Sequence, residues 1–99
     1  MLKHIVFFTF KDTNHGTAQA NAERARTMLT ALPRRIPEIK ALEVGRNIAE
    51  GPAAAHLALT TAFEDEAALE RYRVHPEHQE VVDFIMATTN ERRFVDYWD

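Results

Sequence analysis

Cysteine is absent from this 99-residue chain, and glycine occurs only three times. The lack of cysteine excludes disulfides, thiolate metal sites and cysteine nucleophiles, and it is typical of proteins in a reducing compartment. Glycine is too scarce for a phosphate-binding loop, and the chain contains no GxSxG, Walker or dinucleotide-binding pattern. An excess of basic residues is also missing, because the formal net charge is −3 and acidic residues accompany the basic pairs. We therefore expect no nucleic-acid partner.

Long hydrophobic runs are absent as well. The apolar stretch from Ile5 to Phe10 is too short for a signal-sequence core or a membrane span, so we expect no membrane partner and a cytoplasmic location. A chain of this length forms one domain, taken as residues 1–99. Such a domain buries only about 60–65 % of the surface of its unfolded chain. A small core with a spare apolar face favours dimerisation.

The periodicity of apolar residues predicts four strands and two helices, the second of them interrupted. The expected strands cover residues 2–11, 38–49, 54–63 and 92–98, and the expected helices cover 17–32, 64–74 and a continuation from Pro76 through Met86. Thr17 is the expected N-cap of the first helix, and Gly45 is a site for a bulge. The break falls at His75, because a residue before proline is disfavoured in the α region. The order βαββαβ predicts an α+β, ferredoxin-like domain with a four-stranded antiparallel sheet and helices on one face.

The first strand is apolar on both faces, which indicates that both are covered. Its even-numbered residues, beginning with His4, are predicted to face the helices of this chain. The odd-numbered Ile5 and Phe7 are predicted to form the interface of a homodimer. His56 lies on the opposite face of its strand from the neighbouring leucines, so we expect it at the dimer interface or in solvent. His15 is expected in a loop without a partner.

The segment from Tyr72 to His78 holds three groups that move protons or donate hydrogen bonds, around the forced break between helices. His78 falls in the first turn of the new helix, where free backbone N–H groups disfavour a charged imidazolium. A neutral imidazole beside a phenol is a suitable general-base pair for removing a proton next to a carbonyl. His4, on the helix-facing side of the first strand, could meet the same pocket.

A structural interpretation of these residues also stays open. A histidine before proline often closes a helix turn, and a tyrosine on a helix face usually belongs to the core. We assign structural roles to His75, Pro76 and Asp96. The histidines of this segment could share a cation with a strand histidine, but the proline breaks their helical spacing and no HExxH motif is present. We expect no metal site and no cofactor.

The whole chain resembles the Dabb, or stress-responsive dimeric α/β-barrel, family. The segments MLKHIVFFTFK, IPEIKALEVGRN, TAFEDEAALERYRVHPEHQEVV and RRFVDYWD carry this resemblance in their order and spacing. The resemblance implies a ferredoxin-like subunit whose sheet packs against that of its twin to form a shared barrel. The family includes a plant polyketide cyclase with a histidine base and an assisting tyrosine, which match His78 and Tyr72, while His4 matches a further pocket histidine. Ala25 and Leu29 stand where that cyclase carries aromatic residues, so its substrate does not transfer.

Three functions fit the sequence. The first is a cofactor-independent cyclase, lyase or isomerase for a small carbonyl or polyketide-like compound, with His78 as base, Tyr72 as hydrogen-bond donor and His4 as orienting residue. The second is a non-catalytic, stress-associated homodimer that binds a small molecule in the same pocket. The third is a haem-handling or quinol-type monooxygenase. The expected pocket-lining residues are Val6, Phe8, Leu29, Leu57, Leu59 and Phe94.

Overall fold

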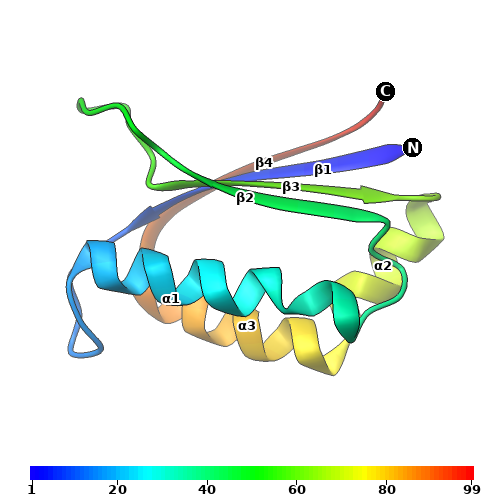
Figure 1. Cartoon of the computed structure of the whole chain (residues 1–99), viewed down its shortest axis with the longest axis horizontal. Coiled ribbons are helices and arrows are strands. Elements are labelled where there is room, and N and C mark those ends of the chain that lie inside the picture. Colours follow the sequence, from blue (N-terminus) through cyan, green and yellow to red (C-terminus); the bar gives the residue numbers. More distant parts are fainter.

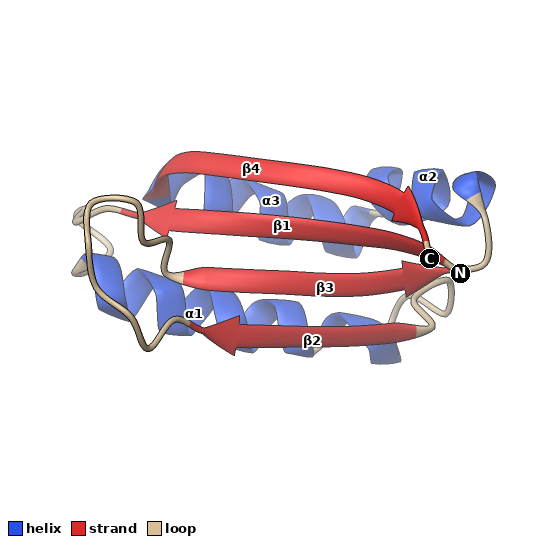
Figure 2. Cartoon of the chain, turned by 90° about the horizontal axis from the view of Figure 1, so that it is seen from above, coloured by secondary structure: helices blue, strands red, loops and turns tan.

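Three helices lie against one face of a four-stranded antiparallel sheet, and the opposite face of the sheet is open (Figure 1). The computed structural model describes all residues from 1 to 99. The elements in chain order are β1 (Leu2–Phe10), α1 (Ala18–Thr30), a short 3₁₀ helix (Leu32–Arg34), β2 (Ala41–Arg46), β3 (Leu57–Phe63), α2 (Glu66–Val74), α3 (Pro76–Thr88) and β4 (Thr89–Trp98). The strand order is β2-β3-β1-β4 (Figure 2). The predicted ferredoxin-like arrangement, with its second helix in two parts, is confirmed.

Two side chains fix where helices begin. The Thr17 hydroxyl accepts a hydrogen bond from the backbone N–H of Ala20 at 3.1 Å, as the sequence predicts for an N-cap. The Asp65 carboxylate does the same for the N–H of Ala68 at 2.8 Å. Helix α2 therefore starts at Glu66, two residues after the predicted position, because the acidic run supplies the cap as well as the first turn.

The hairpin strands β2 and β3 are shorter than predicted because Asn47 closes their loop. Its side-chain oxygen accepts a hydrogen bond from the N–H of Ala49 at 2.8 Å. Its amide nitrogen donates to the carbonyl oxygen of Ala55 at 2.7 Å. Such local hydrogen bonds take the place of backbone hydrogen bonds between the two strands and favour a turn. Residues 47–56 consequently form a loop instead of extending both strands.

The bulge predicted at Gly45 is wrong. The register between β2 and β3 runs without interruption through this glycine. The irregularity lies instead between Thr9 and Phe10, where β1 pairs with β4. Strand β4 begins at Thr89, earlier than predicted, because α3 leads into it directly.

The helix-facing side of the sheet forms the core, and the predicted orientation of β1 is confirmed. Val6 pairs with Leu59 of β3 and with Phe94 of β4, so the three share that face. Of the six residues predicted to line a pocket, Leu57 lines two of the main cavities and the other five line none of them. Five of the six are packed in the core, namely Val6, Phe8, Leu29, Leu57 and Leu59. The sixth, Phe94, is 66 % exposed, because it lies on the edge strand.

The open side of the sheet carries Ile5 and Phe7, as predicted, together with Val95 and Tyr97 of β4. Phe7 is 46 % exposed, because nothing within the chain covers this face. No helix has the length and apolarity needed to cross a bilayer.

Two histidines differ from expectation. His56 accepts a hydrogen bond through Nδ1 from the N–H of Phe10 at 2.9 Å, and the two rings lie 6.0 Å apart. This side chain therefore takes part in the packing of its own subunit. His15 does have a partner, because its ring contacts Phe84 edge-on with centroids 5.8 Å apart.

Candidate functional site

The structure brings the three predicted site residues together at one end of the helix layer. Tyr72 comes from the last turns of α2, His78 from the first turn of α3, and His4 from β1. The Tyr72 and His78 rings are 4.1 Å apart between centroids, and the His4 and Tyr72 rings are 6.3 Å apart. The tyrosine ring is thus in contact with one imidazole and close to the other.

The break between α2 and α3 positions this pair. His75 is extended, with φ −65° and ψ 133°, as expected for a residue before proline. Its backbone N–H donates to the carbonyl oxygen of Tyr72 at 3.2 Å, and its ring Nδ1 accepts from the N–H of Glu77 at 3.1 Å. His75 therefore ends one helix and caps the next, which places Tyr72 and His78 on adjoining turns.

His78 is held as a neutral imidazole with one free nitrogen. Its Nδ1 lies 3.1 Å from the carbonyl oxygen of Arg73, and since a carbonyl can only accept, Nδ1 carries the proton and Nε2 is left as the acceptor. Burial lowers the pKa of His78 below 6.5, and the charges of His4, Arg73 and His75 act in the same direction. The sequence predicts a neutral His78 from its place at a helix N-terminus, but the main cause is burial.

His4 is oriented by a carboxylate. Its Nδ1 lies 2.5 Å from Oδ1 of Asp96, which stands directly opposite His4 in the β1–β4 register. The carboxylate accepts a hydrogen bond from Nδ1–H, which fixes the orientation of the His4 ring. The sequence analysis assigns Asp96 a structural role only. Its partner was missed because the register of an edge strand cannot be read from a single sequence.

Tyr72 buries a hydroxyl group that has no hydrogen-bond partner in the chain. The residue is 1 % exposed, and the Phe63 ring lies 5.0 Å behind its own ring. Burial raises the pKa of the phenol above its usual value, so the hydroxyl stays protonated near neutral pH. An unpaired buried hydroxyl costs about 1–3 kcal/mol, so such groups in folded proteins call for a specific explanation.

Tyr72 is buried, whereas His78 and His4 are partly exposed. Neither Tyr72 nor His78 lines any of the four main cavities. A cavity of about 380 Å³ between α2 and β4 reaches Asp96, with Leu69, Arg73 and Trp98 among its other lining residues. The chain contains no group of three or more side chains placed to hold a metal ion.

A comparison with known protein families identifies the family of this chain. The family model for the stress-responsive A/B barrel domain matches residues 2–99, which is nearly the whole chain. The chain belongs to the Dabb family. An uncharacterised protein from Streptomyces coelicolor is 32 % identical to this Dabb chain over 79 residues, which is 80 % of each sequence.

Solved structures place the same Dabb chain among ferredoxin-like dimers. A dimeric protein of unknown function from Bacteroides fragilis has a TM-score of 0.83 and 29 % identity, covering 99 % of this chain and 95 % of its own. A hydroxynitrile lyase from Passiflora edulis has a TM-score of 0.80, covering 97 % of this chain and 90 % of its own. Its identity of 20 % shows a shared fold and no more.

The low pKa of His78 should make this Dabb domain less stable in mild acid. Between the lowered folded-state pKa and the unfolded value of 6.5, the unfolded chain binds more protons, so the free energy of unfolding falls as the pH drops below 6.5. Glu38 and Asp99, whose pKa values are also lowered, titrate below 4.5 and lie outside this window. Urea unfolding at about pH 7.5 and about pH 5.5 measures how much the free energy of unfolding falls in acid. This decrease should be smaller for His78→Gln than for the wild type. Equal losses in both proteins would contradict the assignment.

Proposed function

We propose that this Dabb chain is a homodimeric, cofactor-independent enzyme that moves a proton at the carbon next to a carbonyl group. The observation that carries the proposal is the unpaired, buried hydroxyl of Tyr72 against the neutral ring of His78. One group is a donor without an acceptor, and the other has a free acceptor nitrogen. A small carbonyl compound satisfies both, because it offers an oxygen to the phenol and an acidic C–H to the imidazole.

Each residue has a defined role in this chemistry. Nε2 of His78 removes the proton from the α-carbon, and the electron pair of that C–H bond moves toward the carbonyl, whose oxygen becomes negative. The buried Tyr72 hydroxyl donates a hydrogen bond to this oxygen, and a donor held in place there stabilises the developing charge. His4, oriented by Asp96, borders the site from the sheet. The protonated His78 then returns the proton to carbon. In a cyclisation, the carbanion instead adds to a second carbonyl carbon of the same substrate, the electron pair of that C=O bond moves to its oxygen, and this oxygen takes the proton from His78.

The open sheet face supports the homodimer. Apolar side chains of β1 and β4 remain uncovered there, and the related Bacteroides fragilis protein of the same fold is dimeric. A small domain gains from burying such a face against a copy of itself. The fold is compatible with lyase chemistry, since the Passiflora edulis protein of this fold is a hydroxynitrile lyase.

A second candidate is a non-catalytic dimer that binds a small molecule at the same cluster. The observation in its favour is again the unpaired hydroxyl of Tyr72, which a bound polar group would satisfy whether or not a reaction follows. In that case the hydroxyl and the imidazole would only hold the ligand in place.

Deuterium exchange separates the two candidates. The wild-type protein in D₂O is expected to accelerate exchange of the α-hydrogens of acetophenone, phenylacetone or phenylacetaldehyde, followed by proton NMR. Exchange tests proton abstraction alone and needs no knowledge of the full reaction. A compound that changes the chemical shifts of His78 binds at the site. If every such compound exchanges its α-hydrogens only at the rate seen in buffer, the protein binds carbonyl compounds without catalysis.

Tyr72→Phe should separate the chemical role of the hydroxyl from packing. Because the hydroxyl is unpaired in the chain, its removal should leave the free energy of unfolding unchanged or raise it by up to about 1 kcal/mol. The exchange rate should nevertheless fall about 10²–10³-fold, which is typical for loss of one donor to a developing oxyanion. Urea unfolding and the NMR assay measure the two effects. A stability loss above about 1.5 kcal/mol with an unchanged rate would assign the hydroxyl to a structural network.

A further inference from the structure

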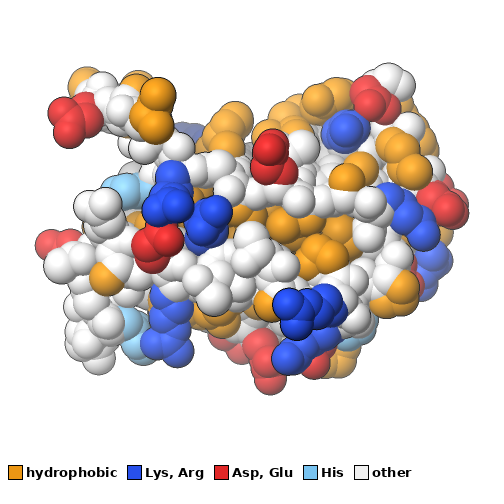
Figure 3. Space-filling model, viewed as in Figure 1, with side chains coloured by type: hydrophobic (Ala, Val, Ile, Leu, Met, Phe, Trp, Pro, Cys, Tyr) orange, Lys and Arg blue, Asp and Glu red, His pale blue; other side chains and the backbone are white.

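A cavity of about 420 Å³ lies under the loop that joins β2 to β3, and we call it the loop cavity. Helix α1 forms one wall, the loop forms the other, and the start of β3 lies between them. In the space-filling view the loop overhangs a hollow, with side chains of both charges below it (Figure 3). The lining residues that matter here are Ala22, Glu23, Arg46, Glu50, His56 and Leu57.

The loop cavity is separate from the Tyr72–His78 cluster. Strand β3 begins with Leu57, which lines the cavity, and ends with Phe63, which packs against Tyr72. Six residue steps along a strand span about 20 Å. The two regions therefore lie at opposite ends of the domain, and an occupant of one does not touch the other.

His56 presents a fixed hydrogen-bond donor to the loop cavity. Its Nδ1 accepts a hydrogen bond from the N–H of Phe10, so the proton of the neutral ring is on Nε2. This N–H has no partner within the chain, and it is not sealed in the core, because the hydroxyl of Tyr72 is the only buried side-chain polar atom left unpaired. The ring therefore offers its Nε2–H to an occupant of the cavity.

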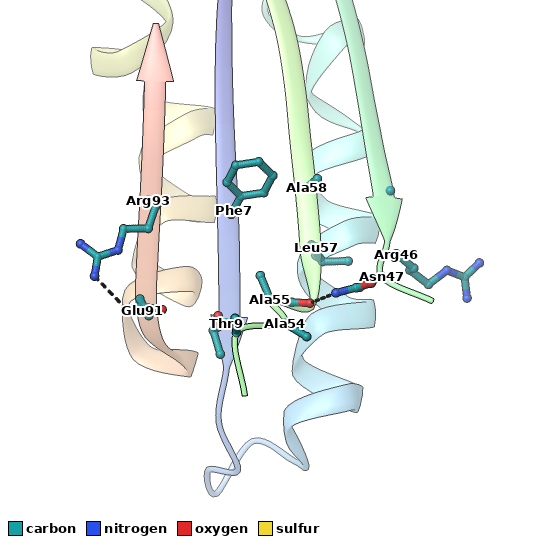
Figure 4. Close-up of a pocket in the computed structure, with 12 residues that line it drawn as sticks. Phe7, Thr9, Arg46, Asn47, Ala54, Ala55, Leu57, Ala58, Glu91 and Arg93 are labelled. Carbon is teal, nitrogen blue, oxygen red and sulfur yellow. Dashed lines mark hydrogen bonds and ion pairs between the residues drawn. The ribbon is translucent and has the colours of Figure 1, made fainter. Parts of the chain in front are cut away.

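Arg46 brings a guanidinium group that is only loosely engaged. Its Nη1 lies 3.4 Å from Oε2 of Glu23, whereas a strong charge-assisted hydrogen bond measures about 2.7–2.9 Å. The same carboxylate also lies 3.9 Å from Arg26. In Figure 4 the Arg46 side chain points away from the larger cavity on the open face of the sheet. The guanidinium group thus keeps N–H donors for a ligand beside α1.

Glu50 supplies a free charge of the opposite sign. It lies in the loop and forms no ion pair within the chain. Between the charged groups the cavity wall is apolar, because Ala22 and Leu57 belong to the hydrophobic core. The loop cavity therefore combines a cation, an anion and a neutral donor with a small apolar surface.

We infer that the loop cavity binds an aliphatic α-amino acid. Arg46 and the Nε2–H of His56 hold the carboxylate, Glu50 holds the ammonium group, and the side chain lies against Ala22 and Leu57. A simple anion would face the charge of Glu50, a simple cation would face Arg46, and a neutral compound would leave both charges unpaired. The cavity volume is within the range of about 300–1,000 Å³ that small-ligand sites occupy.

An NMR titration of the ¹⁵N-labelled protein tests this site. L-valine or L-leucine, at concentrations up to about 20 mM, should shift the backbone amide signals of residues 48–56 and leave those of Tyr72 and His78 in place. The two half-ligands of valine, 3-methylbutanoate and isobutylamine, should each bind at least tenfold more weakly, because each leaves one charged group without its partner. The inference is overturned if neither amino acid shifts these signals, if the shifts centre on His78, or if a half-ligand binds as well as valine.

Charge-neutralising variants test the assigned contacts. Glu50→Gln should weaken valine binding at least tenfold but strengthen the binding of 3-methylbutanoate, because it removes both an attraction to the ammonium group and a repulsion of the carboxylate. Arg46→Gln should weaken both ligands. Glu43→Gln is the matched control for Glu50→Gln, since Glu43 is exposed on β2 and does not line the cavity. Wild-type valine affinity in Arg46→Gln, or equal losses in the two glutamate variants, would refute the site.

Discussion

Replacement of His78 by glutamine should lower the rate of α-hydrogen exchange by about 10²–10⁴-fold, the usual contribution of a general base. Glutamine can keep a hydrogen bond to the carbonyl oxygen of Arg73, but it has no nitrogen that accepts a proton at neutral pH. The Tyr72 donor would still polarise the carbonyl group of the substrate. The residual exchange rate with the variant should therefore remain above the exchange rate in buffer. NMR time courses with and without the variant measure the two rates.

The pH profile strengthens this test. Because burial lowers the pKa of His78, the wild-type exchange rate should stay high at pH 6.5 and decline only at lower pH, where the imidazole becomes protonated. The variant should lack this decline. His15→Gln is the matched control, since His15 is exposed and contacts only the helix residue Phe84 among the aromatic rings. Equal losses of rate in the two variants would show that histidine at position 78 is not the base.

The fold was predictable because its signals are local. Apolar alternation identifies β1, and the polar caps Thr17 and Asp65 start two helices. The His75–Pro76 step fixes the break between α2 and α3. Boundaries that depend on side-chain bonds to the backbone were less predictable. Asn47 ends β2 through its own turn, and nothing in the alternating pattern around it shows which residues its amide will reach.

The proximity of Tyr72 and His78 was predictable from the sequence, whereas other parts of the geometry were not. Tyr72 and His78 come together because a helix break brings positions six residues apart onto adjoining turns, which the sequence spacing reveals. The Asp96–His4 pair depends on the β1–β4 register, which a bulge near Phe10 shifts, and such a shift has no clear signature in the sequence. The size of any cavity between the sheet and the helices depends on how completely the core side chains fill that layer, and a pattern of apolar residues does not specify packing density.

Replacement of Phe63 by alanine should be the most destabilising change at this site, lowering the free energy of unfolding by about 3–5 kcal/mol. Phe63 is fully buried at the end of β3, and its ring packs 5.0 Å from that of Tyr72. The loss combines the transfer free energy of the ring with the cavity left behind. Phe94→Ala is the matched control: its ring is 66 % exposed, so its loss should cost less than about 1 kcal/mol. Urea unfolding of both variants measures the difference.

The milder Phe63→Leu links this packing to the chemistry. Leucine keeps most of the apolar volume but removes the flat surface behind Tyr72, so the phenol gains freedom to turn its hydroxyl away from His78. Since a donor must be held in place before charge develops on the substrate, exchange should slow at least tenfold, while the free energy of unfolding falls by only about 1–2 kcal/mol. A variant that loses stability but retains the wild-type exchange rate would show that Tyr72 does not need Phe63 to hold its position. In that case, the neighbouring His78 ring alone would orient the hydroxyl.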